Sequence, residues 1–211
     1  SKNWLVDMDT LFDRIASGAL AAVSVMAANN ETGVIQPWQA IADLCVEAEI
    51  PYHCDAAQWV GKLPLQGLSA CTYVTACANK FGGPKGVGFM LLPEGAVDFR
   101  LLEGGEQEAA HRAGTEDVAG VLAMSAALEH SKSGKAEARD AFIEQIVQAI
   151  PGAALIGAGT DRLWNTVSMS MPRHQSVRWI RALEKTGFLL SSGSACSTGK
   201  TSVSEVLLAM G

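Results

Sequence analysis

Residues 71–88, CTYVTACANKFGGPKGVG, decide the fold of this chain. An apolar run over residues 71–78 predicts a buried strand, and a second apolar run over residues 87–92 predicts another strand after a glycine-rich turn. Lys80 lies at the end of the first strand, just before that turn. Because α/β folds bind ligands just past the carboxyl ends of strands, Lys80 is a candidate functional residue.

A lysine amine that loses part of its hydration at such a position would favour its neutral, nucleophilic form. The neutral amine forms a Schiff base with a carbonyl compound, and proteins hold the cofactor pyridoxal phosphate (PLP) in this way. The alternative is a solvated lysine at a strand end, and the rarity of buried lysines favours that alternative for any single lysine. A role for Lys80 therefore needs support from other residues.

Strands and helices alternate along the first part of the chain. Helical spacing of apolar residues over residues 5–17 and 37–49 alternates with apolar runs over residues 19–28 and 50–54. This alternation predicts an α/β fold with a mostly parallel sheet and flanking helices.

The pattern changes after residue 100. A polar, glycine-rich stretch over residues 101–114 predicts a long surface loop, and Thr115 is expected to cap a helix over residues 116–131 with two acids in its first turn. A boundary near residue 135 would give a large domain, residues 1–135, and a small α+β domain, residues 136–211. The small domain is expected to contain helices 138–150, 176–185 (closed by Gly187) and 203–210, and strands 153–156, 166–171 and 188–191.

The composition excludes several classes of protein. The 211 residues are 48% apolar and 18% charged, which is typical of a globular protein with a packed core. The net charge of -6 argues against a nucleic-acid binder, and there is no apolar run long enough to span a membrane. Five cysteines without a CxxC pair give little support for a zinc site or another metal site. The odd count, with no signal peptide, predicts reduced thiols and a cytoplasmic location.

Polar side chains follow three of the predicted strands. Asn30 follows the first strand, Asp55 and Gln58 follow the second, and Lys80 follows the third. The carboxyl ends of parallel strands share one edge of a sheet, so these residues are expected to line one site.

A second glycine-rich loop, SGSACSTGK at residues 192–200, resembles a phosphate-binding P-loop. The P-loop needs four residues between its two glycines, whereas five separate Gly193 from Gly199, so the sequence disfavours that interpretation. Cys196 is the more informative residue, because a thiol in a polar, glycine-flanked loop is exposed and available as a nucleophile. An incidental surface thiol is the alternative. The other four cysteines lie in or beside predicted core elements and are expected to be structural.

Five motifs stand out along the chain: AANNETGVIQP, YHCDAAQWVGKLPL, ANKFGGPKGVGF, GGEQEAAHRAGTED and SSGSACSTG. Their order and spacing resemble those of the cysteine desulfurases, which are fold-type I PLP enzymes of the class V aminotransferase group. The chain therefore resembles that family over nearly all of its length, and the resemblance spans the middle and later part of a typical family chain. It implies part of a PLP-binding large domain in residues 1–135 and part of a small domain with the catalytic cysteine in residues 136–211.

The resemblance implies a role for each candidate residue. Lys80 would bind PLP covalently, Asp55 would pair with the pyridinium nitrogen, and Gln58 would donate to the phenolate oxygen. Asn30 would help orient the substrate and the ring. Cys196 would attack the sulfur of the substrate L-cysteine and carry it as a persulfide, with alanine released.

The resemblance also implies how the phosphate is held. Thr115 would reach the PLP phosphate of a neighbouring subunit, which implies a homodimer. Family members commonly have Ser-x-His before the lysine, where both residues hold the phosphate. This chain has Cys77 and Asn79 at those positions, and a thiol is a poor hydrogen-bond donor to phosphate.

Several functions stay open at this point. In the family, the phosphate cup and the ring-stacking histidine lie before the part that this chain matches. The arginine that binds the substrate carboxylate lies after that part. Under one interpretation, therefore, the chain as given would be an incomplete, inactive fragment. A selenocysteine lyase shares most of these motifs, and a class V aminotransferase without a catalytic thiol is another alternative. A non-catalytic scaffold for sulfur assembly is a third. A sulfur-acceptor protein is the expected partner, and iron–sulfur cluster assembly is one destination of the sulfur.

Overall fold

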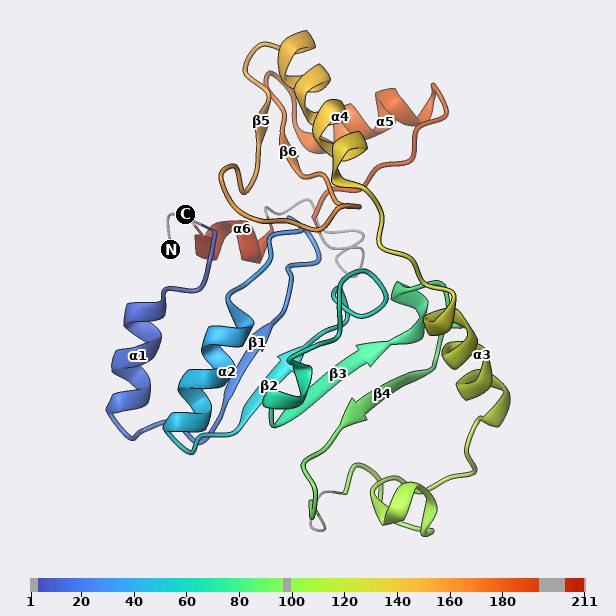
Figure 1. Ribbon diagram of the computed structural model, residues 1–211. Helices are drawn as coiled ribbons and strands as arrows, with labels where there is room; N and C mark the ends of the chain where they lie inside the picture. Colours follow the sequence, from blue (N-terminus) through green and yellow to red (C-terminus); the bar gives the residue numbers. More distant parts are fainter. Residues whose placement is uncertain (1–3, 97–99, 194–203, 211) are drawn as a thin grey trace. The chain divides into compact units, whose positions relative to one another are not determined.

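The computed structural model describes residues 4–96, 100–193 and 204–210 (Figure 1). By contacts between residues the chain divides into two compact units, which are described separately below. The division of the sequence into domains 1–135 and 136–211 stays a prediction. Unit 1 comprises Ser1–Asp7, Ala28–Gln36 and Gly134–Gly211, and unit 2 comprises Met8–Ala27 and Pro37–Ser133.

Unit 2 is built on a four-stranded sheet. Its strands are β1 (Val23–Met26), β2 (Tyr52–Asp55), β3 (Tyr73–Cys77) and β4 (Gly88–Leu91), in that order across the sheet (Figure 1). The first three are parallel, and β4 runs antiparallel to β3. The predicted α/β fold with a mostly parallel sheet is therefore confirmed, with strands shorter than the apolar runs that predicted them.

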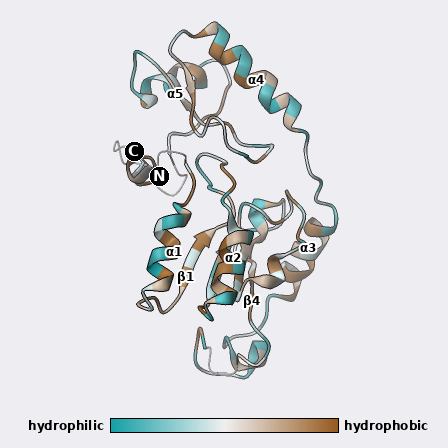
Figure 2. Cartoon of the chain, turned by 60° about the vertical axis from the view of Figure 1, so that its left-hand side comes forward, coloured by the Kyte–Doolittle hydropathy of each residue, from teal (hydrophilic) through white to brown (hydrophobic). Residues whose placement is uncertain are grey.

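Helix α2 (Trp38–Glu47) packs against β1 and β2, and α1 (Met8–Ala16) packs against α2. Trp38 is fully buried, and its ring meets that of Trp59 edge to face, with 5.2 Å between the ring centroids. Helix α1 carries both hydrophilic and hydrophobic residues along its length, as expected for a helix with one solvated side (Figure 2).

Unit 2 buries three thiols, from α2, from β2 and from the residue two positions before β3. Cys45, Cys54 and Cys71 are buried and free, as predicted for structural cysteines. A hydrogen bond with Cys54, together with burial, raises the pKa of the Cys71 thiol, and burial raises the pKa of the Cys45 thiol. Protonated thiols in such a core act as small apolar side chains.

The opposite face of the sheet is more polar and less buried. His53 lies on the middle of three strands and bonds to a hydroxyl on each side. Its Nδ1 is 2.9 Å from Ser24 Oγ, and its Nε2 is 2.8 Å from Thr75 Oγ1. Side chains alternate between the faces of a strand, so Asp55, two residues after His53, belongs to this face.

Helix α3 (Val118–Glu129) begins later than the sequence predicts. Its N-cap is Asp117, whose Oδ1 accepts a hydrogen bond from Gly120 N at 3.0 Å. The predictions that Thr115 is the N-cap and that two acids lie in the first turn were therefore wrong. Both acids precede the first helical residue, and the carboxylate of Asp117 takes the capping role. The helix packs beside Val87, since a Cβ on Gly120 would lie 2.5 Å from Val87 Cγ2.

The connection before α3 is mostly irregular, as predicted for residues 101–114. It contains one short 3-10 helix, η3 (Gln107–Ala110). Another 3-10 helix, η1 (Leu68–Ala70), packs against α2.

Unit 1 contains smaller elements. Strands β5 (Ala154–Leu155) and β6 (Met169–Ser170) form an antiparallel pair. Its helices are α4 (Ala136–Ala149), α5 (Ser176–Glu184) and α6 (Glu205–Met210).

Helix α5 ends as the sequence predicts, but the strand expected after it is absent. Gly187, with φ +90°, donates its N–H to Glu184 O, and Phe188 N donates to Leu183 O. Residues 188–191 form no strand, so the predicted strand 188–191 was wrong. Phe188 and Leu189 are 62% and 93% exposed, and an apolar run stays irregular when no neighbouring strand pairs with it.

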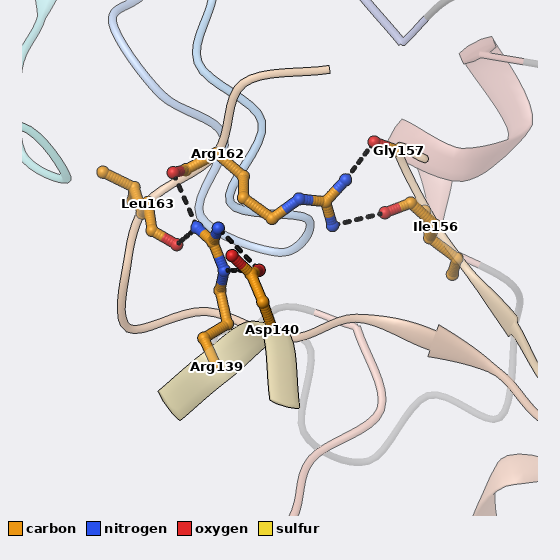
Figure 3. Close-up of polar contacts among 6 residues, drawn as sticks. All are labelled: Arg139, Asp140, Ile156, Gly157, Arg162 and Leu163. Carbon is orange, nitrogen blue, oxygen red and sulfur yellow. Dashed lines mark hydrogen bonds and ion pairs between the residues drawn. The ribbon is translucent and has the colours of Figure 1, made fainter. Parts of the chain in front are cut away.

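Two arginines hold the loop that follows β5 (Figure 3). Arg139 of α4 donates to the carbonyl oxygens of Arg162 at 2.9 Å and Leu163 at 2.8 Å. Arg162 donates in turn to the carbonyl oxygens of Ile156, at 3.3 Å, and Gly157. Asp140 forms an ion pair with Arg139 at 2.7 Å. The bonds of Arg139 thus tie α4 to residues 23 and 24 positions later, and those of Arg162 close the loop locally.

Candidate functional site

Asp55 is the last residue of β2, and the strand ends there because its carboxylate organises the next turn. Asp55 Oδ1 accepts a hydrogen bond from Ala57 N at 3.0 Å. The main chain stays in the sheet, since Asp55 O accepts from Ala27 N at 2.8 Å and Ala56 N donates to Thr75 O at 2.9 Å. The carboxylate is exposed at the carboxyl edge of the parallel strands.

Lys80 lies at the same edge, three residues after the end of the neighbouring strand. Strand β3 ends at Cys77 and continues directly into a 3-10 helix, η2 (Ala78–Lys80). Phe81 N and Gly83 N both donate to Ala78 O, at 3.1 Å and 2.9 Å, which closes the turn tightly. Gly83 is required there, because a Cβ would lie 2.7 Å from Ala78 Cβ. Asn79 and Lys80 are exposed, and Cys77 is half-buried.

The turn after β2 contributes two further residues to unit 2. Gln58 is half-buried in the turn that starts at Ala57. Lys62, later in the same turn, is 6% exposed. Burial, followed by the charge of Lys80, lowers the pKa of the Lys62 amine, while Cys77 acts in the opposite direction. Lys62 was missed by sequence reasoning, since a lysine in a polar turn gives no signal of burial.

Asn30 belongs to unit 1, in a turn that a different asparagine holds together. Asn29 Oδ1 accepts from Glu31 N and Thr32 N, both at 2.9 Å, and from Thr32 Oγ1 at 3.1 Å. Asn29 is 2% exposed, whereas the adjacent Asn30 is exposed. Asn29 is a structural residue that sequence reasoning missed, although an asparagine at the start of a polar loop is a known turn signal.

The remaining two candidates are Thr115 and Cys196. Thr115 is exposed in unit 2, two residues before the N-cap of α3. Cys196 lies outside the described residues, as do the other residues of 194–203. The structure thus places Asp55, Gln58, Cys77, Asn79, Lys80 and Thr115 in unit 2, with Asp55 and Lys80 at one sheet edge, and Asn30 in unit 1.

The residues at the edge of the sheet fit PLP chemically. Asp55 offers a carboxylate, Gln58 an amide and Lys80 an amine, which suit a pyridinium nitrogen, a phenolate oxygen and an aldehyde respectively. The tight turn at Gly83 leaves Lys80 exposed immediately after β3. Ligands of parallel sheets bind at such an edge.

The model of the family described as aminotransferase class-V matches residues 1–210. A cysteine desulfurase of Klebsiella pneumoniae is 36% identical over 206 residues, which cover 94% of this chain and 52% of that protein. Cysteine desulfurase 2 of Trichormus variabilis is 40% identical over 203 residues, which cover 92% of this chain and 51% of that protein. The chain therefore spans about half the length of the curated relatives it matches.

A solved structure supports the fold alone. A NifS-like protein from Rickettsia africae superposes with a TM-score of 0.85 at 23% identity, covering 100% of this chain and 58% of that one. None of the helices in the described part of the chain is both long enough and apolar enough to cross a membrane.

Proposed function

Because this chain belongs to the aminotransferase class-V family, we propose that it has the function of a PLP-dependent cysteine desulfurase. The reaction would convert L-cysteine to L-alanine, breaking the carbon–sulfur bond and forming a sulfur–sulfur bond on an enzyme cysteine. The observation that carries this proposal is the placement of Lys80 and Asp55 at one edge of the sheet. Relatives named cysteine desulfurase at 36% and 40% identity support the choice of substrate.

PLP, when bound, would supply an electron sink for the substrate amino acid. Lys80 would hold the cofactor through its amine and afterwards move protons at the substrate carbon. Asp55, oriented by the N–H of Ala57, would keep the ring nitrogen protonated. Gln58 would donate to the phenolate oxygen, and Asn30 would orient the substrate.

Cys196 would be the nucleophile. Its thiolate would attack the sulfur of L-cysteine, so the sulfur leaves the substrate carbon and stays on Cys196 as a persulfide, and alanine is the other product. The sulfur would pass to an acceptor protein, with iron–sulfur cluster assembly as one destination.

The phosphate would be held by Asn79 and Cys77, and by Thr115 of a second subunit, so the active form would be a homodimer. A cytoplasmic location would suit the free thiols of the core.

The first test is the assembly of the cofactor site. The purified chain is incubated with PLP, reduced with borohydride and mapped by peptide mass spectrometry. We expect a pyridoxyl group on Lys80, which Lys80→Ala removes. Lys85→Ala, which changes an exposed lysine in the same turn, should keep the adduct. No adduct, or adducts scattered over surface lysines, would contradict the proposal.

The second test separates a desulfurase from other enzymes of the family. Cys196→Ala should abolish sulfide release from cysteine while PLP still binds to Lys80. Normal sulfide output from this variant would refute the role of Cys196. A chain that binds a sulfur-transfer partner but takes up no PLP would instead indicate a scaffold.

A further inference from the structure

Helix α5 of unit 1 carries a stripe of three cations. Arg178, Arg181 and Lys185 follow one another at spacings of three and four residues, and Lys185, the C-cap residue, keeps helical backbone angles. At 3.6 residues per turn, the three side chains leave the helix within about 60° of one another around its axis. All three residues are exposed, so α5 has one basic, solvated face.

This stripe has the opposite charge to the chain that carries it. The net charge of the whole chain is -6, whereas residues 172–190 contain four arginines and lysines and a single acid, Glu184. Glu184 leaves the helix about 100° away from the neighbouring Lys185. Among the described residues, no acid forms an ion pair with any of the three cations of the stripe.

An exposed apolar segment follows the stripe directly. Phe188, Leu189 and Leu190 are 62%, 93% and 49% exposed. The segment is fixed at the end of α5, because Phe188 N donates to Leu183 O at 3.1 Å. Contiguous exposed apolar side chains mark interaction sites, and arginine and aromatic side chains beside apolar ones are typical of protein interfaces. We call these six residues, the stripe and residues 188–190, the basic–apolar surface.

The chemistry of the basic–apolar surface fits a protein partner that has acidic side chains beside apolar ones. A nucleic acid or an anionic membrane would also attract the cations. Both are extended polyanions, however, and a chain with a net charge of -6 would be repelled by them outside this surface. An acidic patch on a protein can be as small as the basic–apolar surface and complement both of its halves.

We propose that the basic–apolar surface binds an acidic patch on the protein that accepts the sulfur. The naming of the partner as the sulfur acceptor rests on the proposed function. Cys196, which would carry the persulfide, follows Leu190 by six residues in the sequence. Six residues of chain span at most about 22 Å, so an acceptor bound here would stay near the persulfide. Charge complementarity mainly speeds association, which suits an acceptor that leaves after each transfer.

Binding is tested by fluorescence anisotropy on the full, cofactor-free chain. The probe is a labelled helical peptide with glutamates at positions i, i+3 and i+7 and with leucine and phenylalanine beside them. A matched peptide has lysine in place of each glutamate. The double variant Arg178→Glu/Arg181→Glu reverses two charges of the stripe. Its matched control, Lys132→Glu/Lys135→Glu, reverses two exposed lysines with the same spacing outside the surface.

The acidic peptide should bind equally to the wild-type chain and to the control variant. Arg178→Glu/Arg181→Glu should weaken its binding at least about tenfold, because attraction becomes repulsion at two positions. Leu189→Ser should weaken it about threefold to tenfold through the loss of apolar contact. The lysine peptide should not bind. Circular dichroism checks the fold, and if the reversal variant does not fold, Arg178→Gln/Arg181→Gln should give a smaller loss in the same direction.

Several results would overturn the inference. One is an unchanged affinity for the acidic peptide in the reversal variant, and another is equal binding of the two peptides. A third is stripe-dependent binding of phosphatidylglycerol vesicles or duplex DNA, or stripe-dependent self-association of the chain, in place of peptide binding. Each of these would assign a different occupant to the surface.

A cysteine-containing version of the acidic peptide tests the acceptor role on the PLP-loaded chain supplied with L-cysteine. The peptide thiolate would attack the outer sulfur of the Cys196 persulfide, so that a sulfur–sulfur bond forms on the peptide and Cys196 leaves as a thiolate. Mass spectrometry should find more persulfide on this peptide than on its lysine counterpart, and equal amounts would refute the acceptor role. A chain that binds the peptide but forms no Lys80 adduct would overturn the proposed function and this acceptor role, and would leave the binding surface intact.

Discussion

Unit 2 and unit 1 use different interactions to hold their shape. Most of the buried apolar side chains of the described residues belong to unit 2, where α2 packs against two strands of a four-stranded sheet. In unit 1, Arg139 and Arg162 donate hydrogen bonds to four backbone carbonyls (Figure 3). The buried apolar residues of unit 1, among those described, are Ala28, Val34, Ile143, Ala153 and Leu163.

This difference predicts where each unit is vulnerable. Apolar burial is spread over many side chains, and its contribution to the free energy of unfolding scales with the buried area. A charged side chain that bonds to buried carbonyls concentrates the contribution in one residue, because its loss leaves those carbonyls without partners. In unit 2, substitutions of core residues should therefore cause the largest losses in the free energy of unfolding. In unit 1, substitutions of the arginines should cause the largest losses.

The largest effect is expected from Trp38→Ala in unit 2. Trp38 is fully buried against Trp59, so its removal leaves a cavity that the sheet and α2 fill incompletely. The free energy of unfolding should fall by about 3–5 kcal/mol, measured by urea titration with circular dichroism. Val46→Ala, on the same helix but 64% exposed, is the control and should change little. Equal losses from the two variants would mean that α2 is not held by its buried face.

Arg139→Met in unit 1 should have the next largest effect. Its guanidinium bonds to the carbonyl oxygens of Arg162 and Leu163, and the methionine side chain bonds to neither. We expect a loss of about 2–3 kcal/mol, seen as increased amide exchange of the loop over residues 156–163. Asp140→Asn removes only the ion pair of a carboxylate that is 52% exposed, so it should cost less than about 1 kcal/mol. A larger loss from Asp140→Asn would show that the ion pair, not the carbonyl bonds, stabilises the loop.

The same difference explains how much of the fold could be predicted. The sheet of unit 2 was predictable because its strands are apolar runs, such as 71–78, separated by clear turn signals. In unit 1 the apolar run 188–191 predicted a strand that does not form, because pairing depends on a partner that local sequence does not reveal. The contacts of Arg139 were not predictable either, since they join residues 23 and 24 positions apart.

The candidate site was predictable in part for a similar reason. Asp55 and Lys80 follow strands, and the ends of neighbouring parallel strands meet by geometry. Lys62 and Asn29 were missed because their burial arises from packing of turns and not from a periodic pattern. The roles of all the candidate residues remain predictions.

A smaller effect is expected from the cap of α3 in unit 2. Asp117→Ala removes the carboxylate that accepts from Gly120 N, and the free energy of unfolding should fall by about 1 kcal/mol. Thr115→Ala should leave the stability of the cofactor-free chain unchanged, because Thr115 precedes the cap. The reverse order of losses would restore Thr115 as the N-cap and place the start of the helix earlier.

The smallest effect should be a gain in stability, and it depends on pH. In the cofactor-free chain burial lowers the pKa of Lys62 below the ordinary value of 10.5, so the unfolded chain binds more protons between the lowered pKa and 10.5. The contribution of Lys62 to the free energy of unfolding therefore rises with pH through that window, and below it the full cost of the buried charge is present.

Lys62→Met removes this titration. The variant should gain stability relative to the wild-type chain at neutral pH, and the gain should shrink as the pH approaches 10.5. Urea titrations of both chains from neutral to alkaline pH measure the difference, with Lys132→Met as a control for an exposed lysine. A difference that does not vary with pH would mean that Lys62 is equally charged in the folded and unfolded chains. Unit 2 would then tolerate a buried cation, and the contrast between its apolar core and the polar contacts of unit 1 would weaken.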